Sequence, residues 1–271
     1  GRGRDLLAFL LLDTALHAED SERNMSTILD HLTLSLDAQL HITSLESCDV
    51  SALRRTAKSI ETWPERQRSS IFDTTRRHVE IWQDPGLEMM SDRTDWTPRG
   101  LKDGTKTLYI CVTLDELQTY ASPIRCILGS LIGDLCTGEP VNPASVPFTL
   151  FLDEFPLLGH MKEMETAVSF GRGYGVRPWL FVQNVGQLEG SYKNAKGMIS
   201  NCLVQMYMNP ENEDARDVSE RLGARGNDLY SNAKEKPLAI PQELEGKAFA
   251  NNVVAFAKGT YPARLEKDFT R

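Results

Sequence analysis

Apolar residues recur at helical spacing over roughly the first hundred positions of this 271-residue chain. The stretch DLLAFLLLDTAL is apolar on one helical face. A second helix is expected after Ser21, a residue type that caps helix N-termini, with an apolar stripe of Met25, Ile28, Leu29 and Leu32. A third is expected after Pro64, with an inward face of Ile71, Thr74, His78 and Ile81. We therefore predict an all-α domain over residues 1–104.

From about residue 105 the pattern changes to short runs, apolar on both faces, that alternate with helical stretches. The runs typical of strands are TLYICVT (107–113), FTLFLD (148–153), PWLFVQ (178–183), CLVQMYM (202–208) and NVVAFAKG (252–259). The helix between the first two is expected to begin at Ser122, with Pro123 in its first turn. This alternation predicts an α/β region over residues 105–271, with a mostly parallel sheet between helices.

Composition is that of a soluble globular protein, with 41% hydrophobic and 25% charged residues. No apolar run reaches the roughly 20 residues that span a bilayer. The five cysteines are odd in number and form no CxxC pair, which favours reduced thiols over disulfides or a zinc site. The five histidines are scattered along the sequence without metal-ligand spacing: His17, His31, His41, His78 and His160.

The formal net charge of −8 does not suit unaided binding to a phosphate backbone. Residues 1–104 alone contain 13 Lys and Arg against 18 Asp and Glu, a balance of −5. This acidity favours protein partners, or contact with DNA only through a local basic patch or a neighbouring subunit.

Two adjacent acids, Asp153 and Glu154, close one apolar run. In an open parallel sheet, ligands bind beyond the carboxyl ends of the strands. One acid can bind Mg²⁺, directly or through water, and the next can orient and deprotonate an attacking water. The pair therefore indicates a nucleotide-hydrolysing site, although a strand that ends in a polar turn has the same sequence.

Gln183 closes the next expected strand. If the two strands end side by side, its amide lies near the same γ-phosphate, where one hydrogen bond can report the nucleotide state; the alternative is a polar residue that only ends a strand. In GRGYG (171–175), the spacing and the position after a helix exclude a dinucleotide fingerprint and favour a helix end and turn. Arg172 is expected there on an exposed turn beside the active edge, within reach of a neighbouring subunit's phosphates.

A phosphate loop of the form GxxxxGK[ST] does not occur in the sequence. The single Gly-Lys pair, Gly246-Lys247, is followed by Ala248 where Ser or Thr is required. Since most of the electrostatics at the γ-phosphate depend on that loop, we expect this chain alone to hydrolyse no ATP.

The stretch LFLDEFPLLGHMKEMETAVSFGRGYGVRPWLFVQNVGQLEGSYKN (150–194) resembles the coupling proteins of type IV secretion systems, the TraG/TraD-like conjugation ATPases. The shared pattern is a DEFP strand end, a helix, a Gly-Tyr-Gly-Val turn, a strand ending in Gln, and a QLE..Y helix. The resemblance covers nearly the whole chain. It implies the C-terminal part of a RecA-like P-loop NTPase motor with an inserted, substrate-facing all-α domain.

Matched to the family's motifs, Asp153 and Glu154 correspond to the metal-binding and catalytic acids, and Gln183 to the glutamine of the third motif. Arg172 corresponds to an arginine finger supplied across a hexamer interface, for which Arg177 is an alternative. The resemblance implies ATP and Mg²⁺ as cofactors of the full-length parent, with Asp153 and Gln183 at the nucleotide and Asp153 at the metal.

The implied cargo is relaxase or effector proteins, with single-stranded DNA carried through them, handled together with other secretion components. The implied location is the cytoplasmic side of the bacterial inner membrane, with the membrane anchor and the phosphate loop upstream of residue 1 and this fragment itself soluble. Two alternatives stay open: a non-hydrolysing substrate-docking module, and a related double-stranded DNA translocase. Around 107–113 and 148–153, part of the apolar sheet face is expected to be open.

Overall fold

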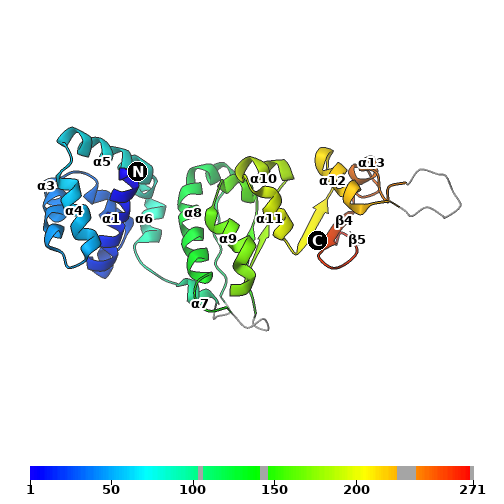
Figure 1. Ribbon diagram of the computed structural model, residues 1–271, viewed down its shortest axis with the longest axis horizontal. Helices are drawn as coiled ribbons and strands as arrows, with labels where there is room; N and C mark the ends of the chain where they lie inside the picture. Colours follow the sequence, from blue (N-terminus) through cyan, green and yellow to red (C-terminus); the bar gives the residue numbers. More distant parts are fainter. Residues whose placement is uncertain (103–105, 141–145, 225–235, 269–271) are drawn as a thin grey trace. The chain divides into compact units, whose positions relative to one another are not determined.

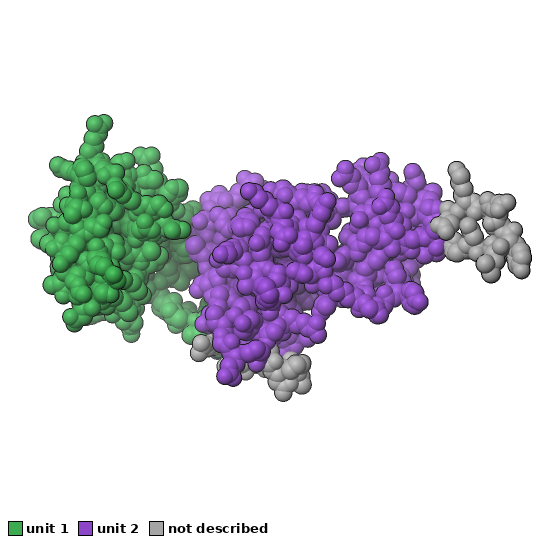
Figure 2. All heavy atoms as spheres, in the orientation of Figure 1, with its two compact units in different colours: residues 1–101 green, residues 102–271 purple. Residues whose placement is uncertain are grey.

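The computed structural model describes residues 1–102, 106–140, 146–224 and 236–268. The chain divides into two compact units, residues 1–101 (unit 1) and 102–271 (unit 2), drawn in separate colours in Figure 2. The domain boundary expected between residues 104 and 105 lies outside the described residues.

Unit 1 is helical throughout its regular elements (Figure 1). Its α-helices are α1 (Arg2–His17), α2 (Met25–His31), α3 (Leu36–Ser44), α4 (Ser51–Glu61), α5 (Glu65–Val79) and α6 (Pro85–Ser91). A short helix, α7 (Pro98–Lys102), ends at the unit boundary. Single 3₁₀ turns occur at Asp20–Glu22, Leu45–Ser47 and Glu80–Gln83.

The core of unit 1 is a continuous apolar cluster contributed by α1 to α5. Its fully buried members include Leu6, Leu10, Leu53, Ile60 and Phe72. The expected stripe on α2 is confirmed, because its residues 28, 29 and 32 are buried.

Two expectations about helices of unit 1 are wrong. The cap of α2 is Asn24 rather than Ser21, and its side chain accepts a hydrogen bond from the Thr27 amide at 3.0 Å. On α5 the inward face is Phe72, Thr75 and Val79 instead of the stripe that begins at Ile71. Burying the phenyl ring of Phe72 removes more apolar surface from water than the alternative face does, so the helix is rotated by one position.

Unit 2 contains both helices and strands. They are α8 (Leu114–Leu135), β1 (Phe148–Leu152), a 3₁₀ turn η4 (Phe155–Leu158), α9 (Lys162–Phe170), a 3₁₀ turn η5 (Gly171–Tyr174), β2 (Val176–Leu180), α10 (Val185–Ser191), α11 (Ala195–Asn201), β3 (Val204–Met208), α12 (Asn212–Leu222), α13 (Pro241–Glu245), β4 (Asn252–Ala257) and β5 (Ala263–Glu266). The α/β class predicted from the sequence is confirmed.

The strands of unit 2 form two sheets in the described residues. β1 and β2 are parallel neighbours, paired from Phe148↔Val176 to Leu152↔Leu180. β3, β4 and β5 form a separate antiparallel sheet in that order. α12 and α13 pack on each other beside this second sheet, around the buried residues Ala215, Val218 and Leu244. The parallel arrangement expected from the sequence thus applies to β1 and β2, the pair that positions the predicted site.

Helix α8 differs from the expected start at Ser122. It begins at Leu114 and includes Pro123 in its interior, and the Thr113 hydroxyl just before it donates to the Glu116 carboxylate at 2.6 Å. Burial of its apolar face, which starts at Leu117, favours helix over about two turns before the expected start. Across the described residues, no helix has both the length and the apolar character to cross a bilayer.

The expected strand at 107–113 is not formed in this structure. A strand exists through its hydrogen-bonded neighbours, and no strand among the described residues pairs with this segment. Its side chains are largely exposed, with Tyr109 at 80%. The composition of this segment favours a strand, but a strand does not form without a partner strand.

Candidate functional site at the carboxyl ends of β1 and β2

The chain turns sharply where β1 ends. Glu154 adopts a left-handed conformation, with φ 46° and ψ 39°, and Pro156 follows in the first turn of η4. Such a backbone is unfavourable for a residue with a side chain by about 1–2 kcal/mol. The surrounding pairing holds it, because the Phe181 amide donates to Leu152 O at 3.0 Å and the Phe155 amide donates to Phe181 O at 3.1 Å. Strain at one acidic position is typical of functional sites.

The two acids differ in their surroundings. Asp153 is exposed, and its Oδ1 accepts the Glu154 amide at 3.1 Å. Glu154 is only partly exposed, and the side-chain amide of Gln183 donates to its carboxylate, with Nε2 at 3.1 Å from both Oε1 and Oε2. The expectation that the two strands end side by side is confirmed, and it brings Gln183 onto Glu154 rather than Asp153.

A second glutamine, which the sequence analysis did not single out, extends this contact. Gln187 Nε2 donates to Gln183 Oε1 at 3.1 Å. The backbone amide of Gln187 in turn donates to the side-chain oxygen of Asn184, the residue that caps α10. Gln187 Oε1 is buried and has no hydrogen-bond partner in the part of the chain that the structure describes. The start of α10 is thus linked through Gln183 to the Glu154 carboxylate.

Tyr192 fixes the loop that follows the acids. Its hydroxyl donates to Gly159 O and accepts from the Met161 amide, each at 3.1 Å. Its ring, 1% exposed, stacks on Phe155 with centroids 5.3 Å apart. Burial raises the pKa of Tyr192 to about 12, so the hydroxyl is neutral and can donate. Because Phe155 directly follows Glu154, this packing holds the turn that presents the acid.

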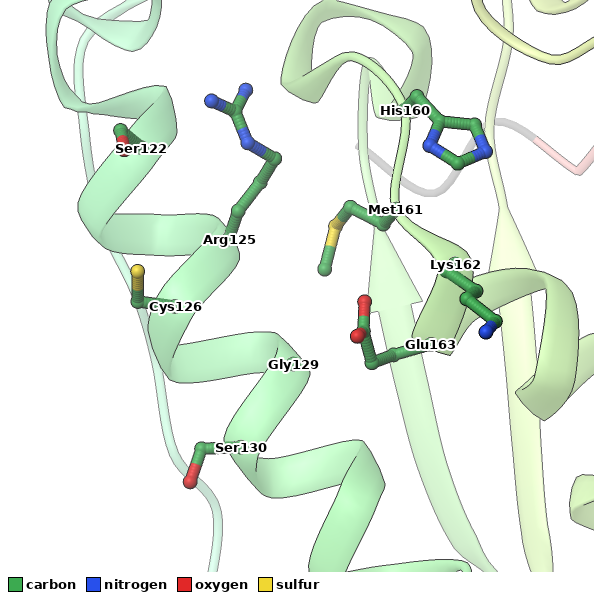
Figure 3. Close-up of a pocket in the computed structure, with 9 residues that line it drawn as sticks. All are labelled: Ser122, Arg125, Cys126, Gly129, Ser130, His160, Met161, Lys162 and Glu163. Atoms are coloured by element: carbon green, nitrogen blue, oxygen red, sulfur yellow. The ribbon is translucent and has the colours of Figure 1, made fainter. Parts of the chain in front are cut away.

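Helix α8 holds the same loop from its other side. Arg125 Nη1 donates to Leu158 O at 2.6 Å. Between α8 and the segment 160–163 lies a surface cavity of about 380 Å³. Figure 3 shows Arg125 on the helix and, across this space, the side chains of Met161 and Glu163. None of the predicted site residues lines this cavity, so the cavity is distinct from the acidic edge.

Arg172 lies in η5, before β2 begins, and is exposed. Because β1 and β2 are parallel, it is at the amino end of the pair, opposite to Glu154, separated by a five-residue strand of roughly 13 Å. The expectation that Arg172 lies beside the acids is wrong. The glycines around it form the expected turn: Gly175 has φ 73°, and a side chain at Gly171 would be 3.1 Å from Val176 O.

Two acids and a glutamine thus meet at the carboxyl ends of two parallel strands, the edge at which open α/β sheets bind ligands. The family described as "Type IV secretory system Conjugative DNA transfer" matches residues 14–237, most of the chain. The chain therefore belongs to this family of type IV secretion coupling proteins.

Curated relatives agree with this assignment. The chain is 25% identical over 182 residues to the conjugal transfer protein TraG of Escherichia coli, covering 63% of this chain and 29% of that protein. It is 24% identical over 267 residues to the type IV secretion system-coupling protein VirD4 of Bartonella quintana, covering 91% of this chain and 42% of that protein. The chain thus spans less than half the length of each of these relatives.

Solved structures show the same fold. The plasmid coupling protein TrwB in complex with ADP and Mg²⁺ matches with a TM-score of 0.74 at 18% identity, over 99% of this chain and 63% of that chain. TrwB bound to a non-hydrolysable ATP analogue matches with a TM-score of 0.73 at 17% identity. The fold of this chain is therefore that of coupling proteins crystallised with nucleotides.

Proposed function

We propose that this chain supplies the catalytic carboxyl edge of a coupling protein that recruits secretion substrates and drives their transfer with ATP. The observation that carries the proposal is the contact of the Gln183 amide with both oxygens of the Glu154 carboxylate. A hydrogen-bonded acid on a strained turn, next to a second, exposed acid, is suited to water activation. The family membership favours this function over that of a related double-stranded DNA translocase.

The residues of this edge fit a bound Mg²⁺ and nucleotide. Asp153 offers exposed carboxylate oxygen, the ligand type that Mg²⁺ prefers, and the buried Gln187 Oε1 is a polar acceptor without a partner in the described residues. Bound Mg²⁺ would neutralise charge on the phosphates. In this proposal Asp153 holds the metal, Glu154 orients and deprotonates the attacking water, and Gln183 couples the state of Glu154 to α10.

Arg172 acts, in this proposal, on a neighbouring subunit. Its place at the amino end of β2, away from its own acids, is unsuited to a role within one chain. An oligomer with head-to-tail interfaces, such as the hexamer expected for the parent, would bring this arginine to the next subunit's acidic edge. Arg177, exposed within β2, is the alternative donor.

Unit 1 is proposed to receive the substrate. It has a core of its own and an acidic balance, which suits relaxase or effector proteins with basic signals. Deleting residues 1–101 from the full-length parent should abolish pull-down of its substrate while ATP binding is retained. Unchanged pull-down would count against the receptor role. As part of the same proposal, the parent functions at the cytoplasmic side of the inner membrane with other secretion components.

The catalytic proposal is tested in the full-length parent protein. Glu154→Gln should reduce the rate of ATP hydrolysis by at least about 100-fold, since general-base catalysis contributes 10²–10⁴-fold. Glu189→Gln, an exposed glutamate on α10, is the matched control and should leave the rate unchanged. Full activity of the Glu154 variant would refute the assignment. The 271-residue chain alone should show no Mg²⁺-dependent turnover.

A further inference from the structure

Three helices of unit 1 bring together residues that the sequence separates. Asp13 comes from α1, His31 from α2 and His41 from α3, and one possible ligand atom from each lies within 4.8 Å of the others. The histidines are scattered along the sequence, but the packing of these helices brings two of them next to Asp13. The sequence spacing of 28 residues between Asp13 and His41 gives no sign of the contact.

The carboxylate of Asp13 is the centre of this cluster. Its side chain is 3% exposed, although it is charged. Oδ2 lies 2.6 Å from His41 Nε2, and Oδ1 lies 2.9 Å from Nδ1 of His17, one turn further along α1. These two contacts hold the carboxylate in one orientation, so the cluster has an oriented oxygen donor.

His31 completes the cluster by stacking on His41. The ring centroids are 4.3 Å apart and the rings are inclined by 13°. The side chain of His41 is 34% exposed, which leaves the cluster open to an ion from solvent.

We propose that Asp13, His31 and His41 form a zinc site that joins α1, α2 and α3 of unit 1, with a water molecule as the fourth ligand. Two imidazole nitrogens and one carboxylate oxygen form a donor set typical of Zn²⁺ with an open position. His17 orients the ligating carboxylate of Asp13, because its Nδ1 forms a hydrogen bond with Oδ1 while Oδ2 faces His41.

To bind the ion, the His41–Asp13 pair must open, and His31, whose ring now stacks on that of His41, must turn a ring nitrogen toward the ion. Bonds of about 2.0–2.1 Å in a tetrahedral site separate two ligand atoms by roughly 3.3 Å. The His41–Asp13 pair, now 2.6 Å apart, opens by less than about 1 Å when Zn²⁺ replaces the proton that the two groups share. Both histidines are near helix ends, where side-chain rotation does not disturb the apolar core.

The test uses the full 271-residue chain, freed of metal and titrated with ZnCl₂ in a calorimeter. One equivalent of Zn²⁺ should bind and raise the melting temperature of unit 1. His31→Ala and His41→Ala should each abolish stoichiometric binding, whereas His78→Ala, an exposed histidine on α5, should bind as the wild type does. Binding that persists at wild-type affinity in both ligand variants would overturn the proposal, as would no binding by the wild type.

Two further variants distinguish the zinc ligands from neighbouring residues that do not bind the ion. His17→Ala should weaken Zn²⁺ binding by about 10–100-fold without abolishing it. Cys48 Sγ lies 3.9 Å from His17 Nε2, so Cys48→Ser tests a thiolate ligand, and it should leave affinity unchanged. Should the histidine variants misfold, X-ray absorption on the wild-type zinc complex decides: two imidazole ligands and no sulfur support the site, and sulfur or purely oxygen ligation contradicts it.

Discussion

The core of unit 1 and the parallel strand pair of unit 2 differ in how completely they cover their own apolar residues. In unit 1 the large core side chains, such as Phe72, are fully buried among five helices. In the strand pair, Phe151, Trp179 and Phe181 form an aromatic row that stays 66%, 47% and 42% exposed. A helical bundle can close its core with local segments, whereas a sheet face needs a covering layer. The strand pair that carries the nucleotide site of the proposed function thus leaves an aromatic face exposed.

The largest expected effect is in the core of unit 1. Phe72→Ala should lower the free energy of unfolding of unit 1 by about 3–5 kcal/mol, through lost burial and the cavity left behind. Urea unfolding followed by tryptophan fluorescence can separate the units, because Trp179 is in unit 2 and the other tryptophans precede residue 102. The Trp179 transition should not move. A shared shift of both transitions would show that the units unfold together.

The next effect concerns Tyr192 and alkaline pH in unit 2. Burial raises the pKa of Tyr192 from 10.0 to about 12 in the folded state, so folding favours the protonated form. The resulting stability is complete below pH 10 and is lost as pH rises towards 12, by about 3 kcal/mol.

Tyr192→Phe provides the control for this prediction. The variant should be less stable than the wild type at pH 8, because Gly159 O and the Met161 amide lose their partner, by about 1–3 kcal/mol. It should also lose less stability between pH 10 and 12, with a remainder from Tyr207, whose pKa burial also raises. Identical alkaline slopes for wild type and variant would contradict the role assigned to Tyr192.

A smaller effect, a gain in stability, is expected when the strained Glu154 is replaced. Glu154→Gly should raise the free energy of unfolding of unit 2 by about 1 kcal/mol, since glycine adopts the left-handed backbone without penalty. The same change should abolish hydrolysis in the full-length parent. Destabilisation by the glycine would mean that the hydrogen bonds with Gln183 outweigh the backbone strain.

The smallest effect on stability is expected at the exposed aromatic row. Phe151→Ser should change the free energy of unfolding by less than about 0.5 kcal/mol, in contrast to Phe72→Ala. It should instead reduce self-association of the 271-residue chain, measured by analytical ultracentrifugation, because exposed apolar patches promote association. A large loss of stability would show that this ring is buried in solution.

Local patterns in the sequence predict much of this structure and of its site. The apolar runs that become β1 and β2 are short and bounded by turn residues, and parallel pairing of neighbouring strands brings Gln183 to Glu154. In α5, two overlapping series of positions fit a helical face, and only packing selects the one containing Phe72. For the segment at 107–113, β-propensity is strong, but a strand also needs a partner.

Hydrogen bonds between a side chain and a distant backbone atom leave no pattern in the sequence. Tyr192 bonds the backbone at residues 159 and 161, and Arg125 bonds that of residue 158, so no spacing of residue types predicts either contact. The Asp13 cluster depends on how three helices cross. The position of Arg172 could have been predicted from strand direction. Arg172 precedes one parallel strand and Glu154 follows the neighbouring strand, so the two residues lie at opposite ends of the pair.

The central claim is that one subunit supplies Glu154 and the next supplies Arg172 to a shared site. The most direct measurement is ATP hydrolysis by mixed oligomers of the full-length parent, assembled from equal amounts of Arg172→Ala and Glu154→Gln subunits. Each variant alone should be inactive. Random mixing should restore about one quarter of wild-type activity, because that fraction of head-to-tail interfaces pairs an intact acid with an intact arginine. No recovery in mixed oligomers, or full activity of the Arg172 variant alone, would contradict the account.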